Sequence, residues 1–150
     1  MKVGMETKQE LYSRVMRSVR SRDNRSTEMK LAQYLRDHRI GGWRRQYPLR
    51  ANPDIAFPKL KVAVFTDGCF WHGHSCVKNP PKTNRDFWER KIQRNRERDQ
   101  RPNAMLRRKG WKVVRLWECE LRRGEIKRLL EVLKEKETSR RDAPPSAPDR

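Results

Sequence analysis

The chain has 150 residues, of which 34% are hydrophobic and 38% are charged. This length suits one domain with its own core and is short for two. No stretch is apolar enough to cross a bilayer and no secretory signal opens the chain, so the sequence predicts a soluble cytoplasmic protein that contacts no membrane. Lysine and arginine number 38 against 19 acidic residues, a net charge of +19. This excess favours a polyanionic partner, although a merely soluble basic surface is the alternative.

Two helices are predicted at the N-terminus. Leu11, Val15 and Val19 recur every four residues in a first, arginine-rich helix. A second helix is predicted within "STEMKLAQYLRDHRIGG", with Ser26 or Thr27 as its N-cap and glycines at its end. Its apolar face consists of Leu31, Ala32 and Leu35.

A β-hairpin follows the helices. The stretch "WRRQYPL" alternates like a strand, and "PDIAFPKLKVAVFTDG" predicts strands over residues 55–57 and 62–65 joined by a turn at Pro58 and Lys59. Next comes a long basic helix, because residues 82–112 hold twelve basic and four acidic residues. Thr83 or Asn84 caps this helix, Pro102 breaks or restarts it, and Gly110 ends it.

The last third contains one strand and one helix. "WKVVRLWE" predicts a strand that places Cys119 just beyond its end. "GEIKRLLEVLKEKE" predicts an amphipathic helix. Its inward face consists of Ile126, Leu129, Leu130 and Leu133. The tail from Thr138 has no apolar anchor and is expected to be disordered. The whole is a mixed α/β core with three to five strands.

A metal site is predicted from the cysteines and histidines. Three cysteines are an odd number for a disulfide framework, and thiolates with imidazole are the ligands that Zn²⁺ prefers. Cys69, His74 and Cys76 form a C-x4-H-x-C loop, and Cys119 is the remaining cysteine. Incidental thiols are the alternative. His72 can compete with His74 as a ligand; otherwise it is available for proton transfer, or is structural.

A second site is suggested by oxygen ligands near the hairpin. Asp54 precedes one predicted strand, and Thr66 and Asp67 end the other. Mg²⁺ takes carboxylates, water and phosphate oxygens, as phosphodiester hydrolysis requires. A simple Pro-Asp turn is the alternative for Asp54. Glu28 lies on the inward face of its helix, where it either favours the helix N-terminus or reaches metal-bound water.

Aromatic residues stand between the candidate zinc ligands and on the basic helix. Trp88 taken alone is more simply a core residue. Phe70 and Trp71 are adjacent on a tight metal-bound loop and cannot easily both point inward. Stacking on bases or wedging between base pairs would give them a role.

The sequence resembles a known family. The segments "PDIAFPKLKVAVFTDGCFWHGHSC", "FWERKIQRNRERD" and "GWKVVRLWEC" are similar to those of the very short patch repair (Vsr) DNA mismatch endonucleases, over about residues 7–133. The resemblance implies a fold related to type II restriction endonucleases with an added structural zinc. It also implies nicking of duplex DNA on the 5′ side of the thymine in a T:G mismatch, which arises when 5-methylcytosine is deaminated.

The resemblance also implies roles for individual residues. Asp54 would bind the catalytic Mg²⁺, assisted by the main-chain carbonyl of Thr66. His72 would be the general base or stabilise the transition state. Glu28 would act through metal-bound water, and Asp99 would be a supporting acid. The zinc ligands would be Cys69, His74, Cys76 and Cys119.

The resemblance also implies which residues contact DNA, and the sequence departs from the family at one position. Phe70, Trp71 and Trp88 would wedge into DNA beside the mismatch, and Met16 would insert from the minor-groove side. Asp67 stands where the best-known branch of the family has a second active-site histidine, so its role is open. It would join the metal shell or support His72. Neighbouring strand residues face opposite ways, so Thr66 and Asp67 can both serve only if the strand has ended.

The sequence therefore predicts an α/β protein with a restriction-endonuclease-like core, a mixed β-sheet flanked by helices, and a structural zinc site. Residues 1–22 would be a basic helical arm on DNA, residues 23–137 the Vsr-like endonuclease domain, and residues 138–150 a disordered tail. The expected activity is Mg²⁺-dependent, strand-specific nicking by a monomer. The alternative is a zinc-stabilised nucleic-acid-binding module without catalysis.

Overall fold

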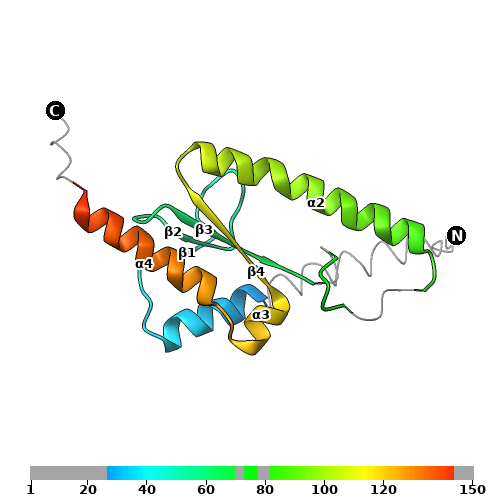
Figure 1. Ribbon diagram of the computed structural model, residues 1–150, viewed down its shortest axis with the longest axis horizontal. Coiled ribbons are helices and arrows are strands. Elements are labelled where there is room, and N and C mark those ends of the chain that lie inside the picture. The colour runs from blue at the N-terminus through cyan, green and yellow to red at the C-terminus, as the bar shows by residue number, and fades with distance from the viewer. Residues whose placement is uncertain (1–26, 70–72, 78–81, 144–150) are drawn as a thin grey trace, which may run out of the picture.

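A four-stranded mixed sheet, in the order β1-β2-β3-β4, forms the centre of the protein (Figure 1). The computed structural model describes residues 27–69, 73–77 and 82–143. The strands are β1 Arg44–Arg45, β2 Ile55–Phe57, β3 Val62–Asp67 and β4 Lys112–Trp117. The β1-β2 and β2-β3 pairs are antiparallel, whereas β3 and β4 are parallel. A parallel pair needs a long crossover, and helix α2, Arg85–Arg108, supplies it.

The predicted hairpin is confirmed. β2 and β3 are buried at every position, and the chain turns between them with Lys61 in the left-handed region, φ 51°. β1 is shorter than "WRRQYPL" suggested, because only two of its residues pair with β2. Gln46, which follows β1, has φ 48° and so leaves the extended conformation.

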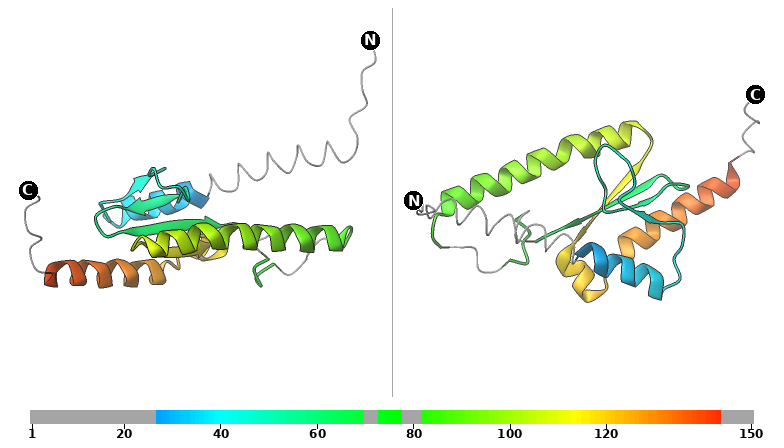
Figure 2. Two further views of the ribbon diagram at one scale, coloured as in Figure 1. Left: turned by 90° about the horizontal axis from the view of Figure 1, so that it is seen from above. Right: turned by 180° about the vertical axis from the view of Figure 1, so that it is seen from behind.

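Helices cover both faces of the sheet, which confirms the predicted class. The helix over residues 27–37 and helix α4, Lys127–Asp142, lie on one side, and α2 lies on the other (Figures 1 and 2). The first side holds the larger core. Its fully buried members include Leu31, Leu35, Ile55, Val64 and Leu129. On the α2 side, Ala63, Phe65 and Leu106 form a smaller cluster. Alternate residues of β3 therefore face different layers.

Helix α2 corrects one expectation. Pro102 lies inside the helix, which continues to Arg108 without a break. Proline removes only its own N–H bond, and the turn that follows it is anchored by Leu106, which is 1% exposed. The helix begins after Asn84 as predicted, although no side chain makes a capping bond there. It ends before Gly110, whose φ is 82°.

The expected boundary at Thr138 is wrong, because it falls inside α4. Ile126, Leu129 and Leu133 are buried and anchor the first turns of that helix, and the last turns extend beyond the sheet (Figure 1). Adding residues to an existing helix costs far less than starting one, so the exposed turns continue the buried ones. Residues 144–150 lie outside the described structure.

The start of the chain also lies outside it, including the predicted first helix, the basic arm of residues 1–22, Met16 and Ser26. Thr27 is already helical and is 1% exposed, so it is not the residue that precedes the helix. Within the described ranges, no helix is long and apolar enough to cross a membrane.

Candidate functional site

Four residues meet where β3 and β4 end. The ligand atoms of Cys69, His74, Cys76 and Cys119 all lie within 4.8 Å of one another. None of the three cysteines forms a disulfide. The Cys119 thiol lies 3.6 Å from Nδ1 of His74, and its backbone N–H points to the Cys69 sulfur at 3.4 Å. The cluster offers three sulfurs and one imidazole nitrogen, a donor set that can hold a metal ion.

The parallel register explains how residues 50 positions apart meet. Asp67 pairs with Trp117 at the ends of β3 and β4. Cys69 lies two residues after the end of β3, and Cys119 lies two residues after the end of β4. Cys119 is the second residue of helix α3, Glu118–Arg123. Parallel strands end at the same edge of a sheet, so both cysteines arrive at one place.

The environment of the cluster favours a cation. Burial, together with the neighbouring thiols Cys76 and Cys119, raises the pKa of the Cys69 thiol to about 12, although the hydrogen bond from the Cys119 N–H opposes the shift. Without a cation the Cys69 thiol therefore stays protonated, whereas a bound metal ion would hold it as a thiolate. The Trp117 ring stacks on His74 with 4.2 Å between ring centroids and fixes the plane of the imidazole.

Gly73 allows the loop to approach α2. Its φ is 63°, and a Cβ at this position would lie 2.8 Å from Nη2 of Arg96 and 2.9 Å from Cγ2 of Ile92. The same Arg96 nitrogen donates to the Gly73 carbonyl at 2.9 Å. We expect Gly73→Ala to lower the free energy of unfolding by about 1–2 kcal/mol, through the positive φ and the close contact. Urea unfolding measures this change. Gly41→Ala is the control, since its Cβ would meet nothing within 4 Å, and equal stability of the two variants would contradict the expectation.

A carboxylate site lies on the side of β3 that faces the helix over residues 27–37. One Asp54 oxygen accepts hydrogen bonds from the backbone N–H of Thr66, at 2.7 Å, and from its hydroxyl, at 3.1 Å. The Thr66 hydroxyl also lies 3.1 Å from that of Thr27, so the helix over residues 27–37 packs against this point. Asp54 is thus fixed at the start of β2, beside the end of β3.

Negative charge accumulates around Asp54. Its pKa is raised to about 6, chiefly by burial and further by the charges of Glu28 and Asp67, against the opposing effect of the two Thr66 hydrogen bonds. Glu28 is 9% exposed and forms an ion pair with Arg45 of β1, with 2.7 Å between Nε and Oε1. A carboxylate that is reluctant to ionise, beside two other acids, is the electrostatic setting in which a cation binds well.

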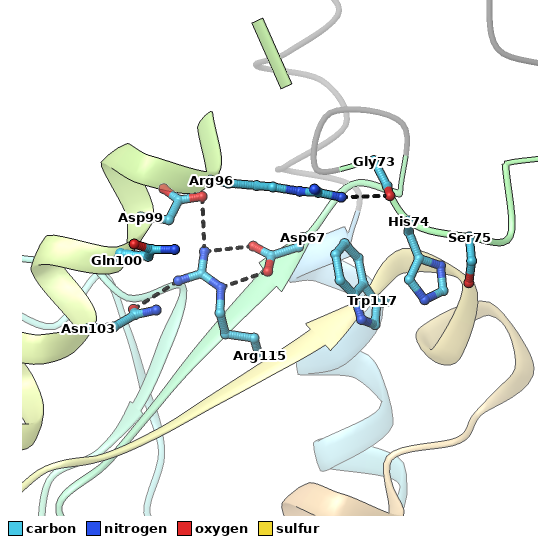
Figure 3. A pocket seen from close by; sticks show the side chains of 10 residues that line it. All are labelled: Asp67, Gly73, His74, Ser75, Arg96, Asp99, Gln100, Asn103, Arg115 and Trp117. Carbon is cyan, nitrogen blue, oxygen red and sulfur yellow. Dashed lines mark hydrogen bonds and ion pairs between the residues drawn. The ribbon is translucent and has the colours of Figure 1, made fainter. Parts of the chain in front are cut away.

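Asp67 belongs to the opposite face. β3 continues through Asp67, so its side chain turns toward α2 while that of Thr66 turns toward Asp54. Arg115 of β4 holds both Asp67 oxygens, with distances of 2.7 Å and 2.8 Å (Figure 3). Arg115 also lies 3.3 Å from Asp99 and donates to Asn103 at 2.9 Å. The four residues line a cavity of about 410 Å³ between α2, the strand ends and the metal loop.

Comparison with known proteins gives the family. A family model described as "DNA mismatch endonuclease Vsr" matches residues 6–78. The type II nicking enzyme V.XorIIP of Xanthomonas oryzae pv. oryzae is 49% identical over 74 residues, which are 49% of this chain and 54% of that protein. The type II nicking enzyme V.NmeAIP of Neisseria meningitidis serogroup A is 46% identical over 89 residues, 55% of this chain and 64% of that protein. The chain therefore spans between half and two thirds of the length of these two relatives.

A third relative has broader coverage. The DNA mismatch endonuclease Vsr of Escherichia coli K12 is 37% identical over 114 residues, which are 75% of this chain and 72% of that protein. The chain belongs to the Vsr family.

The structure brings together most of the described residues to which the Vsr resemblance assigns a role. The four proposed zinc ligands form one cluster, and Asp54, Thr66 and Glu28 share one side of β3. Asp67 and Asp99 lie with Arg115 on the α2 side, separated from Asp54 by the strand. His72, Phe70, Trp71 and Met16 lie outside the described residues.

Trp88 differs from the Vsr expectation of a wedge. Its side chain is 5% exposed, whereas its neighbour Phe87 is 45% exposed. The two rings meet edge to face, 5.4 Å apart. Consecutive helical residues point about 100° apart, which lets Trp88 pack against the protein while Phe87 faces solvent. Trp88 therefore is not on the surface as a wedge requires, and Phe87 is the exposed aromatic here.

Sequence reasoning missed two arginines of this Vsr-family site, Arg45 and Arg115. For Arg115 there was a signal, because it interrupts the apolar run "VVRLW" of a strand with a buried partner. A charge in such a strand needs an opposite charge nearby. Arg45 gave no such signal, since its strand is two residues long and exposed.

Proposed function

We propose that this chain is a Mg²⁺-dependent DNA endonuclease that nicks one strand of duplex DNA on the 5′ side of the thymine in a T:G mismatch, and so starts very short patch repair. It would act as a monomer. The observation that carries the proposal is the Asp54 site: a carboxylate fixed by Thr66, beside Glu28, at a strand end next to the cysteine cluster.

The residues at this site fit Mg²⁺. In a chain of net charge +19, burial and the charges of Glu28 and Asp67 raise the Asp54 pKa to about 6. In an extended strand the N–H and C=O of one residue point to the same side. The Thr66 N–H points to Asp54, so its carbonyl lies on that side too. A carboxylate and a carbonyl are oxygen ligands that Mg²⁺ accepts.

Each residue then has a defined task in the proposed mechanism. Asp54 and the Thr66 carbonyl would hold the cation, and Glu28 would act as a hydrogen-bond acceptor beside them. Bound Mg²⁺ supplies polarisation of the scissile phosphate and a water of lowered pKa. His72 takes or stabilises a proton in the displacement. Arg45 limits the negative charge by neutralising Glu28.

The cysteine cluster would be a structural Zn²⁺ site. Three sulfurs and one nitrogen are a typical closed zinc set. Residues 70–72 stand between the ligands Cys69 and His74 in the sequence. The zinc would thus fix Phe70 and Trp71, the proposed wedge, and His72, the proposed proton-transfer group. A mispaired site costs less to unstack than a matched one, which supports preference for a mismatch.

Helix α2 would contact the DNA backbone. A hollow of about 480 Å³ along it is lined by Phe87, Arg90, Lys91, Arg94, Asn95 and Arg98. Four of these six carry positive charge, and Phe87 offers an exposed ring. Cations that neutralise phosphates release counterions, so binding should weaken steeply as salt rises.

The test is a nicking assay on a panel of duplexes with T:G, U:G, other mismatches or a matched pair, each in several sequence contexts. The proposal predicts Mg²⁺-dependent nicking that is strongest at T:G and weak on the matched duplex. Binding of all duplexes without any nick would instead support the alternative, a zinc-stabilised binding module. Strong nicking at U:G but not at T:G would keep the chemistry and change the lesion.

A further inference from the structure

The Arg115 guanidinium is in contact with four side chains, those of Asp67, Asp99, Asn103 and Phe65. Asp67 is 5% exposed, and Arg115 grips both of its oxygens (Figure 3). From α2, Asp99 approaches Nη2, which also binds Asp67, and Asn103, one turn further on, accepts a hydrogen bond from Nη1. The guanidinium also lies 4.7 Å above the Phe65 ring. A planar, two-point bond to a carboxylate is strong and fixes the orientation of that carboxylate.

The network adjoins the proposed Mg²⁺ site through a single peptide bond. Thr66 binds Asp54 through its N–H and hydroxyl, and the next residue is Asp67. By holding the Asp67 side chain, Arg115 restrains the residue that is bonded directly to the Thr66 carbonyl carbon. The two faces also interact electrostatically, since the charge of Asp67 helps to raise the pKa of Asp54.

The Arg115 guanidinium lies between two carboxylates. Asp67 and Asp99 both approach the same Arg115 nitrogen, Nη2, at 2.8 Å and 3.3 Å. Two carboxylates so close to one centre form a pair of ligands that a divalent cation would bridge if no positive group stood between them. The guanidinium stands in that place, and burial is countered by the charges of Asp67 and Asp99, so its pKa is raised and it stays protonated.

We propose that Arg115 is a positioning residue of the nicking site: it anchors Asp67, and with it the strand end that carries the Thr66 carbonyl, and it prevents a second cation from binding between Asp67 and Asp99. The proposal rests on the proposed function for the identity of the cation. It assigns Asp67 a role as the acceptor that anchors Arg115, in place of metal ligation.

The test uses zinc-loaded, full-length protein and two readouts. Binding of Mn²⁺, a spectroscopic substitute for Mg²⁺, is titrated by electron paramagnetic resonance, and nicking of a T:G duplex gives kcat and KM. Arg115→Met removes the cation but keeps most of the volume above Phe65. Asp67→Asn combined with Arg115→Met removes both charges. Arg123→Met is the control, since Arg123 is exposed and pairs only with Glu125 among the contacts described, at 3.1 Å.

For Arg115→Met we expect one additional Mn²⁺ per chain and a kcat lowered by about 10–100-fold, with KM changed little. The double variant should return to the wild-type number of bound Mn²⁺ ions and recover about tenfold in kcat, because an asparagine side chain is not an anionic ligand. An unchanged Mn²⁺ number in Arg115→Met, together with a double variant as slow as the single one, would show a merely structural role and overturn the proposal.

Folding and function can be separated in this design. If Arg115→Met does not fold, Arg115→Lys is used instead, because lysine keeps the charge but cannot hold both Asp67 oxygens. For this variant we expect an unchanged number of bound Mn²⁺ ions and a kcat reduced about tenfold. A wild-type kcat would contradict the positioning role. Mn²⁺ titration needs no nicking. Suppose that the wild-type protein never nicks, while the Arg115→Met variant binds one more Mn²⁺ than wild type. This pair of results would refute the proposed function and support the role of Arg115 in excluding a cation.

Discussion

Replacing Asp54 with asparagine is expected to abolish nicking and, at the same time, to stabilise the fold. Nicking of a T:G duplex should fall by about a thousandfold or more, because an amide replaces the charged ligand of the proposed cation. The free energy of unfolding should rise because Asp54 is half-buried near Glu28 and Asp67, and the variant removes the Asp54 charge. Functional sites commonly carry such a stability cost.

The pH dependence of this gain has a definite sign. The folded pKa of Asp54 is about 6, against 3.8 for the ordinary carboxyl. The folded state therefore binds the proton more tightly, and this group's contribution to stability is complete below pH 4 and is lost as pH rises through 6. Without added Mg²⁺, Asp54→Asn should exceed wild type by about 1–3 kcal/mol at pH 7.5 and by little at pH 4.

Urea unfolding of zinc-loaded protein at the two pH values measures the difference. Asp37→Asn is the control, because Asp37 is exposed and, among the described residues, its one hydrogen bond is accepted from Gln33 at 2.7 Å. An Asp54→Asn variant that nicks like wild type would contradict the mechanism. A variant that is inactive because it is less stable at pH 7.5 would contradict the electrostatic account of the site.

Replacing Cys119 with serine should have the second large effect, on folding. Cys119 ties α3 to the loop that contains Cys69, His74 and Cys76. A complete structural Zn²⁺ site supplies about 10–16 kcal/mol of binding free energy. Losing one thiolate should cost about 3 kcal/mol or more, and so lower Tm by about 10 °C or more.

Metal analysis and thermal unfolding measure this prediction together. Wild type should contain one zinc per chain, and Cys119→Ser much less. Ser75→Ala is the matched control, since Ser75 is exposed between two ligands and provides none of the four. A Cys119→Ser protein with full zinc content and wild-type Tm would contradict the assignment of Cys119 as a ligand.

Features set by local pattern were predictable from the sequence. The hairpin with strands over residues 55–57 and 62–65 was predicted from its buried β-branched residues and turn, and the cluster of Cys69, His74, Cys76 and Cys119 from their chemistry and the position of Cys119 after a strand. The structure adds why Cys69 and Cys119 meet, since the pairing of Asp67 with Trp117 sets their register.

Features set by tertiary contact were not predictable. Whether Pro102 breaks α2 depends on the packing of Leu106, and the length of α4 depends on the anchoring of its first turns. The face occupied by Asp67 depends on where β3 ends: because β3 continues through Asp67, Thr66 and Asp67 face opposite ways. The partner that fixes it, Arg115, is 48 residues away in the sequence.

The most direct measurement of the central claim is strand-specific mapping of the nick. A T:G duplex labelled at each end in turn is incubated with zinc-loaded wild type or Asp54→Asn, with and without Mg²⁺, and the products are sized at single-nucleotide resolution. The account predicts a single nick in the thymine strand immediately 5′ to the mismatched thymine, only with wild type and Mg²⁺. An intact duplex that the wild-type protein nonetheless binds, or equal cutting of both strands, would contradict it.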